Sequence, residues 1–352
     1  MQDGGLPKAL ACLQTFLPEI EWLPLESRRT CLYQRAPDMQ LPVALECLEN
    51  LIGYGFSKQS LLIEAMTHAS YNTGLQSLER LEFLGDSILD NIVVQTMWNQ
   101  PTELSHIQMH LIRTALVNAD FLAFICMEWS IDQEASNLVE VKGRGRNFTY
   151  DEVASTVRMP FWKFLRHASP EMAKVEITTS VWHNKLRNAI NEAIQTGKNY
   201  PWALLAKLQA QKFYSDMIES LLGAIWVDSG SFEICTQVVE RMGILPYLRR
   251  ILRDDVHILH PKEEIGQLAD SETVKYKLCN KLNEATGERE YLCKLLVGER
   301  DVVEVDGGVS KMEVQTKAAE MAVEILKAEK AQAARMHMDG GDEGDRMDVD
   351  EI

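Results

Sequence analysis

Three acidic residues in one short segment stand at helical spacing. Glu79, Glu82 and Asp86 are separated by three and then four positions, so on a helix their side chains lie along one face among apolar residues. Like charges stacked in this way repel, and removing unpaired carboxylates from water is costly. Two interpretations remain. Either a bound cation neutralises the stripe, or the acids form a solvated face with ion pairs such as Glu79–Arg80.

A second segment repeats this arrangement further along the chain. Asp216 and Glu219 are three positions apart, Lys212 lies one helical turn before Asp216, and core-type residues surround them. Gly85 and Gly223 would allow two such helices to cross closely. The acids of both helices would then offer the all-oxygen ligation that Mg²⁺ prefers. Paired ions of this kind serve in-line displacement at phosphorus, so the repeated pattern favours the cation interpretation.

Several stretches of the sequence resemble one nuclease family. Residues 79–87 read Glu-Arg-Leu-Glu-Phe-Leu-Gly-Asp-Ser and resemble the signature of the ribonuclease III family at every position. Residues 65–71, Ala-Met-Thr-His-Ala-Ser-Tyr, resemble the element that precedes this signature. The segment with Asp216, Glu219 and Gly223 resembles the second metal-binding element of the family.

A narrower resemblance covers roughly residues 5–330. Lys212 matches a lysine characteristic of Dicer enzymes. The stretches at residues 197–202, 212–216 and 260–264 resemble the C-terminal region of the second type of fungal Dicer-like proteins. Only one copy of the nuclease signature is present. The resemblance therefore leaves open whether the chain acts alone or is a piece of a larger Dicer.

The resemblance implies a role for each matched residue. Asp86, Glu219 and Lys212 would be catalytic, with Lys212 either stabilising charge at the scissile phosphate or only pairing with Asp216. Glu79 matches a structural position, and His68 is expected to be a packed, hydrogen-bonded histidine rather than a general base. Mg²⁺ would be the cofactor, with Mn²⁺ as a substitute. The implied metal-binding carboxylates are Glu82, Asp86, Asp216 and Glu219.

Residues 260–330 resemble a domain that binds double-stranded RNA. The implied RNA-binding residues are Lys311 and Lys317, which would face phosphates, and Gln267, which would bond a 2′-hydroxyl in the minor groove. However, Met312 and Gln315 stand where the family has further lysines. This segment holds eleven basic and fifteen acidic residues. We therefore expect a domain that folds well but holds RNA weakly, with protein contact as an alternative use.

Composition restricts how an RNA partner is held and where the chain works. The 352 residues carry a formal net charge of −16, so a polyanion must be bound by local basic patches or bridging cations. The seven cysteines form no C-x-x-C pair, which suits a reducing compartment and gives no zinc signature. No apolar run is long enough for a membrane helix, and no signal peptide is recognisable. We expect an intracellular protein of cytoplasm or nucleus, not secreted and without a membrane partner.

The pattern of apolar residues predicts a mainly α fold in several parts. Residues 41–250 would form an all-helical ribonuclease III endonuclease domain, within which residues 136–180 are expected to be an insertion or mobile loop. A small α/β domain of order α-β-β-β-α would follow at residues 256–330. Residues 1–40 are a proline-rich extension or linker with one short helix at residues 8–16. Residues 331–352 are an acidic tail expected to be disordered.

Together these patterns predict a metal-dependent endonuclease that cuts double-stranded RNA in RNA silencing or antiviral defence. Its products would carry 5′-phosphate and 3′-hydroxyl ends with short 3′ overhangs. A staggered double cut needs two sites, so we expect a homodimer or pairing with a second ribonuclease III domain. Leu81, Phe83, Leu84 and Ile88 are the candidates for that interface. The alternative is a catalytically silent scaffold that uses the same fold for dimerisation or RNA binding.

Overall fold

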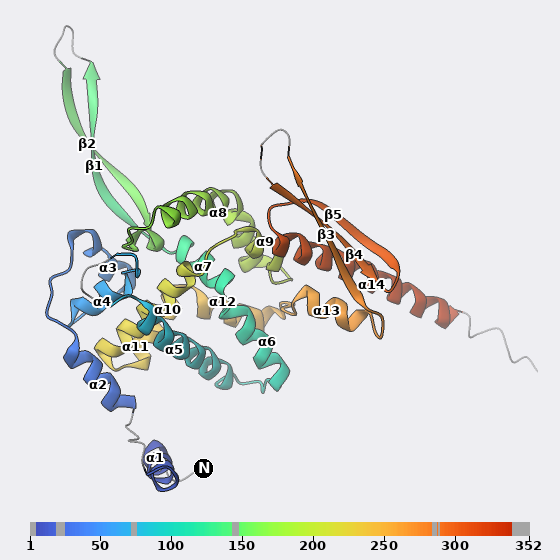
Figure 1. Ribbon diagram of the computed structural model, residues 1–352, viewed down its shortest axis with the longest axis horizontal. Helices are drawn as coiled ribbons and strands as arrows, with labels where there is room; N and C mark the ends of the chain where they lie inside the picture. The colour runs from blue at the N-terminus through green and yellow to red at the C-terminus, as the bar shows by residue number, and fades with distance from the viewer. Residues whose placement is uncertain are drawn as a thin grey trace, which may run out of the picture. The chain divides into compact units, whose positions relative to one another are not determined.

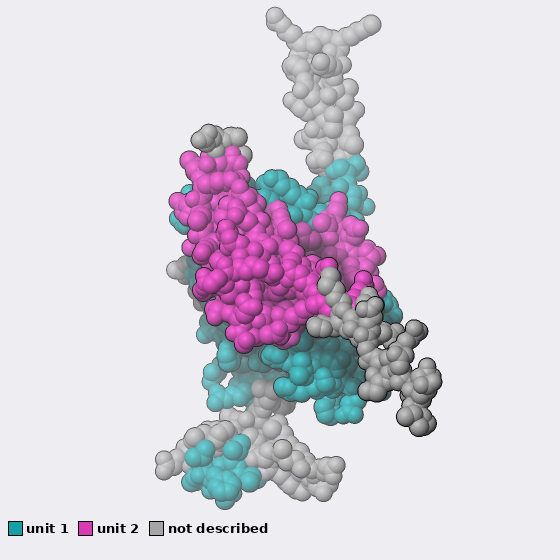
Figure 2. Space-filling model, turned by 90° about the vertical axis from the view of Figure 1, so that its right-hand side faces the viewer, with its two compact units in different colours: residues 1–187, 210–255 teal, residues 188–209, 256–352 magenta. Residues whose placement is uncertain are grey.

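The chain divides into two separately packed units (Figure 2). Unit 1 contains residues 1–187 and 210–255, and unit 2 contains residues 188–209 and 256–352. The division falls within one helix, α8 (Pro170–Thr196). The structure is a computed structural model that describes residues 5–18, 25–71, 76–142, 148–283, 287 and 289–339.

Helices make up most of unit 1, as the apolar spacing predicts (Figure 1). Besides the first part of α8, there are two 3₁₀ helices, η1 (Val43–Leu45) and η2 (Phe161–Phe164). The α-helices of the described part are α1 (Gly5–Phe16), α2 (Leu25–Arg35), α3 (Leu48–Ile52), α4 (Gln59–Ala65), α5 (Glu79–Trp98), α6 (His106–Leu116), α7 (Ala119–Glu128), α10 (Phe213–Ser229), α11 (Phe232–Arg241) and α12 (Ile244–Asp254).

Helix α10 is the centre of unit 1. Every residue from Met217 to Asp228 is buried, because α10 packs against α4, α5, α7 and α11. A helix that is covered on all sides needs apolar side chains around its whole circumference, and this sequence supplies them. The acidic residues of its first two turns therefore emerge from the core of the unit.

Two glycines allow α5 and α10 to cross with their backbones in contact. A Cβ atom added at Gly85 would lie 1.7 Å from the carbonyl oxygen of Glu219, and one added at Gly223 would lie 2.2 Å from that of Leu81. No real Cβ atom approaches an oxygen so closely, so only glycine fits at either position. The predicted close crossing is confirmed, and it brings the two acidic segments together.

A β-hairpin corrects the prediction for residues 136–180. Strands β1 (Ser130–Lys142) and β2 (Phe148–Pro160) pair antiparallel with Ser130 opposite Pro160, and α8 begins ten residues later. A mobile loop is therefore wrong for most of this segment. The strands run out from the helices of unit 1 in Figure 1. Residues 156, 157 and 158 are exposed in succession, so this part of β2 has no buried face that apolar alternation could reveal. Residues 143–147, which hold the glycine-arginine repeat, lie outside the described residues.

Both ends of the chain contain more helix than the sequence predicts. Helix α1 matches the expected short helix near residues 8–16, but α2 was missed because its eleven residues have weak apolar spacing. At the other end, α14 (Lys311–Asp339) continues through residues 331–339, which were expected to be disordered. Residues 340–352 lie outside the described residues.

Unit 2 has the predicted α-β-β-β-α order. Helix α13 (Pro261–Leu268) is followed by an antiparallel sheet of β3 (Val274–Leu282), β4 (Arg289–Val297) and β5 (Arg300–Gly308), and then by α14. Inward-facing β-sheet residues such as Cys293, Leu295 and Val305 pack against α14. Ala318, Ala319 and Ala322 keep that helix close to the sheet. Helix α9 (Trp202–Lys207) also packs on α14, so residues 188–209 belong to this unit.

Among the described residues, no single helix is long and apolar enough to span a membrane. The bent pair of α6 and α7 meets the criteria of length and composition only, and α7 is buried in the core of unit 1.

The helix crossing can be tested with a matched pair of glycine substitutions. Gly85→Ala should lower the free energy of unfolding by about 1–3 kcal/mol or more, because the added methyl group collides with the backbone of α10. Gly55→Ala in the same unit meets nothing within 4 Å and should change stability little. Urea unfolding followed by circular dichroism would compare the two. Equal stability of both variants would contradict the close crossing.

Candidate active site

Three of the four predicted carboxylates gather where α5 and α10 cross. Glu82 from α5 and Asp216 and Glu219 from α10 each place an oxygen within 4.8 Å of the others. Glu82 and Asp216 are half-buried, and Glu219 is buried. Asp86 lies one turn further along α5 and is exposed, outside this tight group. We call Glu82, Asp216 and Glu219 the acid cluster.

Lys212 closes one side of the acid cluster. Its Nζ donates a hydrogen bond to Glu82 Oε1 at 2.6 Å and another to Asp216 Oδ1. The ammonium therefore joins the two helices. Burial lowers the pKa of Lys212, but the hydrogen bonds to Asp216 and Glu82 outweigh this and hold the pKa well above its usual range. Lys212 is consequently a permanent cation at the site, and its pairing with Asp216 was one of the two predicted roles, whereas its bond to Glu82 was not predicted.

Glu219 has the most perturbed acid group of the site. Burial, followed by the charges of Asp86 and Asp216, raises its pKa to about 8. Burial also raises the pKa values of Asp216 and Asp86. Lys212 thus compensates only part of the negative charge. A buried carboxyl group lies here among other carboxyl groups, and their oxygens can all act as ligands. Such a group of ligands fits a hard divalent cation.

An ion pair missed by the sequence analysis lies beside Asp86. Arg113 of α6 donates to Asp90 Oδ1 at 2.9 Å, so α6 is tied to α5 one turn beyond the predicted ligand. The Asp90 charge raises the pKa of Asp86, and the Arg113 charge lowers it. Nothing in the residue spacing of the sequence indicated that Arg113 would pair with Asp90.

Neighbouring residues of the signature have structural contacts. Arg80 pairs with the buried Glu64 of α4, with Nη2 2.8 Å from Oε2, and not with Glu79. Glu79 accepts a hydrogen bond from Ser77. The expected Glu79–Arg80 ion pair is therefore wrong, although Glu79 and Asp86 are exposed to solvent. His68 Nδ1 lies 3.0 Å from the Ser70 hydroxyl, which agrees with the hydrogen-bonded role.

The predicted RNA-binding residues all lie on the surface of unit 2. Lys311 begins α14, Lys317 follows on the same helix, and Gln267 is exposed near the end of α13. Their role in RNA binding stays a prediction.

A further cation of unit 2 was missed. Lys262 donates to Gln315 Oε1 at 2.9 Å, and its Nζ lies 3.9 Å from Met312 Sδ. A lysine of α13 thus reaches the place where α14 lacks its own lysines. In the sequence alone, Met312 and Gln315 indicate lost positive charge, because residue spacing does not place Lys262 beside them.

Comparison with protein families identifies the class of the chain. Residues 79–230 match the family described as the ribonuclease III domain, and residues 254–352 match the double-stranded RNA-binding domain of Dicer-like protein 2. The chain therefore contains a ribonuclease III domain followed by a double-stranded RNA-binding domain of the Dicer-like type.

Individual relatives extend this result to most of the chain. It is 45% identical over 342 residues to Dicer-like protein 2 of Cryphonectria parasitica, and 44% identical over 339 residues to Dicer-like protein 2 of Pyricularia oryzae. These alignments cover 92% and 90% of this chain but 24% and 23% of the relatives, so the chain spans about a quarter of their length. The solved nuclease domain of ribonuclease III from Campylobacter jejuni covers 56% of this chain and 94% of its own length, with 21% identity and a TM-score of 0.36.

The raised pKa of Glu219 predicts how stability depends on pH without metal. Between the usual glutamate pKa of 4.5 and about 8, the folded state holds a proton that the unfolded state releases. Stability from this group is therefore lost as pH rises through that range. In EDTA at pH 8, Glu219→Gln should raise the Tm by at least about 2 °C, and the gain should disappear near pH 5. Differential scanning calorimetry would measure both.

The exposed Glu233 on α11 provides the matched control. Glu233→Gln should leave the Tm within about 1 °C of wild type at both pH values, because surface substitutions have small effects. A pH-independent effect of Glu219→Gln would contradict the electrostatic explanation.

Proposed function

We propose that this chain is a Mg²⁺-dependent endonuclease that cleaves double-stranded RNA, with Mn²⁺ as a substitute metal. The observation that carries the proposal is the acid cluster, with Lys212 beside it, at a helix crossing in a ribonuclease III domain. The double-stranded RNA-binding domain at residues 254–352 supports the choice of substrate.

Each residue of the site has a part in this proposal. Glu82, Asp216 and Glu219 would hold the cation, and Asp86, one turn further along α5, would be the fourth carboxylate of the site. The bound metal would supply an activated water and stabilise charge on the scissile phosphate. Lys212, already positioned by two carboxylates, would place its positive charge next to the scissile phosphate.

The electrostatics of the site favour an enzyme over a silent scaffold. Gathering partly uncompensated carboxyls in a buried crossing destabilises the protein, and a scaffold gains nothing from it. A metal site gains cation affinity from the same arrangement. The proposed products have 5′-phosphate and 3′-hydroxyl ends with short 3′ overhangs. The proposed setting is RNA silencing or antiviral defence inside the cell, in cytoplasm or nucleus.

Cleavage assays on long duplex RNA test the proposal directly. Asp86→Asn and Glu219→Gln should each lower the single-turnover rate by at least about 100-fold, because each removes a charged group next to the metal. Glu233→Gln should cut at the wild-type rate. EDTA should abolish cutting, and Mg²⁺ or Mn²⁺ should restore it.

These measurements decide between enzyme and scaffold. Undiminished cutting by either site variant at saturating Mg²⁺ would refute the assignment. Failure of wild-type protein to cut with either metal, while still binding duplex RNA, would favour the scaffold.

Pairing of two sites is the second part of the proposal. Of the predicted interface candidates, Leu81 and Ile88 are buried in the core of unit 1 and Leu84 is half-buried, whereas Phe83 is 79% exposed. An apolar ring of this size next to the acid cluster suits a contact with a second ribonuclease III domain. We propose that the isolated chain forms a homodimer through this face, or pairs there with a separate domain.

Light scattering at micromolar concentration tests the pairing. Phe83→Ser should shift the protein from dimer to monomer and convert staggered double cuts into single-strand nicks, because one site reaches one strand. Ile107→Ser removes another side chain that is 69% exposed, on α6, and should leave the dimer intact. A monomeric wild-type protein that still makes staggered cuts would refute this arrangement.

A further inference from the structure

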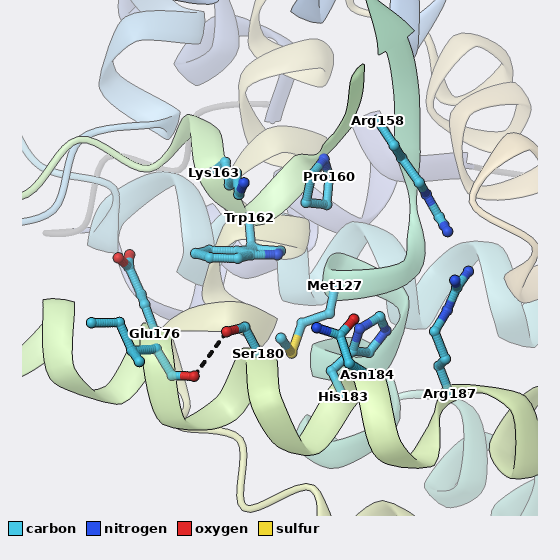
Figure 3. A pocket seen from close by; sticks show the side chains of 11 residues that line it. Met127, Arg158, Pro160, Trp162, Lys163, Glu176, Ser180, His183, Asn184 and Arg187 are labelled. Atoms are coloured by element: carbon cyan, nitrogen blue, oxygen red, sulfur yellow. Dashed lines mark hydrogen bonds between the residues drawn. The ribbon is translucent and has the colours of Figure 1, made fainter. Parts of the chain in front are cut away.

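A cavity of about 430 Å³ in unit 1 lies between η2, the end of β2, α7 and α8 (Figure 3). Its volume falls within the usual range for small-molecule sites, about 300–1,000 Å³. Three cations line it, namely Arg158, Lys163 and Arg187, together with one acid, Glu176. Glu176 is paired with His167 at 3.0 Å. The cavity therefore presents several basic groups in a chain with a net charge of −16.

A single carboxylate fixes two of these cations. Glu128 Oε1 accepts hydrogen bonds from Arg187 Nη2 at 2.6 Å and from Arg158 Nη2 at 3.1 Å, and His183 Nε2 lies 3.0 Å from Oε2. Burial alone would raise the pKa of Glu128, but the hydrogen bonds from His183, Arg187 and Arg158 hold it well below its usual range. Both guanidinium groups are thus held in place before any ligand arrives.

Donors remain available on both arginines. A guanidinium group has five N–H donors, and the contacts with Glu128 and Ser130 occupy only the Nε and Nη2 atoms. The Nη1 group of each arginine has no hydrogen-bond partner among the described residues. Such free N–H edges match phosphate oxygens.

An aromatic surface lines the same cavity. The Trp162 ring is half-buried, and Lys163 Nζ lies 5.7 Å from its centroid. Figure 3 shows the Trp162 side chain in the middle of the lining residues, with Met127 beside it and the two arginines on one side. A flat apolar ring next to fixed phosphate donors suits a ligand that combines an aromatic base with a phosphate.

The cavity also adjoins the helix that carries the acid cluster. The Trp162 and Tyr214 rings meet edge to face with centroids 6.2 Å apart, and Tyr214 lies between Lys212 and Asp216 in the sequence. A ligand in the cavity would therefore lie one side chain away from the first turn of α10.

We propose that this cavity is a nucleotide-binding site. The phosphate bonds the Nη1 groups of Arg158 and Arg187, and the base stacks on Trp162 next to Lys163. Inorganic phosphate would leave the ring uncovered, and an apolar ligand would leave the guanidinium donors unpaired. The nucleotide can be free, or it can be an unpaired nucleotide of an RNA strand. Binding does not depend on cleavage, so the site is independent of the proposed nuclease activity.

Isothermal titration calorimetry in EDTA, with the full chain, tests this site. The wild type should bind AMP more tightly than inorganic phosphate. Trp162→Leu and Lys163→Glu should each weaken AMP binding by about tenfold or more, since stacking and one cation are lost. Lys185→Glu is the matched control, because Lys185 also lies over a tryptophan, Trp182, at 4.8 Å but does not line the cavity. Its affinity should stay within about twofold of wild type.

A second experiment identifies the source of the nucleotide. Duplex RNA with two unpaired 3′ nucleotides is compared with the same duplex with blunt ends, again in EDTA. If the unpaired ends raise affinity in the wild type but not in Trp162→Leu, the nucleotide belongs to an RNA strand. If AMP binds but the two duplexes do not differ, the ligand is a free nucleotide. Either result supports a nucleotide site.

Three results would overturn the proposal: no preference for AMP over phosphate, unchanged affinity in Lys163→Glu, or an equal loss in Lys185→Glu. Lys163 is exposed, so its substitution keeps the test valid even if Trp162→Leu fails to fold, which thermal melting would reveal. The same titration with Asp86→Asn separates this proposal from the nuclease assignment. AMP binding should persist in that variant whatever its cleavage rate.

Discussion

The contact between the backbones of α5 and α10 determines most of what this protein can do. Gly85 and Gly223 each face a carbonyl oxygen of the other helix at a distance that excludes any side chain. Because the helices touch there, Glu82 and Glu219 reach one another although they are 137 residues apart in the sequence. The buried α10 makes this crossing rigid, since all its sides are packed. Sites supported by rigid elements keep their groups in fixed positions.

The sequence predicted this centre well because its signals are local. Three- and four-residue spacing placed the acids on helices, and the two glycines indicated a close crossing. The sequence was a poorer guide to contacts of the site that involve residues from a distant segment of the chain. The exposure of Asp86 outside the acid cluster, the Arg113–Asp90 pair and the approach of Lys262 to Gln315 depend on how separate helices pack. No spacing rule contains that information.

The missed secondary structure has a similar physical cause. Strands β1 and β2 are held by pairing with each other, and three successive exposed residues in β2, 156–158, interrupt the alternation that identifies a half-buried strand. Helix α14 continues past Ala328 without an apolar face because helix, once begun, propagates through good helix formers such as alanine, lysine and glutamate. Apolar spacing in a sequence reflects which side chains are buried. Helices and strands that bury few side chains therefore cannot be predicted from it.

The half-buried Glu128 and the buried Glu219 show how unit 1 treats negative charge in two ways. Glu128 is surrounded by His183, Arg187 and Arg158, and its pKa is held low, so the protein itself compensates this charge. Glu219 lies among other acids, and burial together with their charges raises its pKa to about 8, which the charge of Lys212 lowers only in part. The protein neutralises Glu128 with its own cationic side chains, but it does not do the same for Glu219. The missing positive charge at Glu219 is therefore a property of the site, and a divalent cation is the group whose charge and preference for oxygen ligands would supply it.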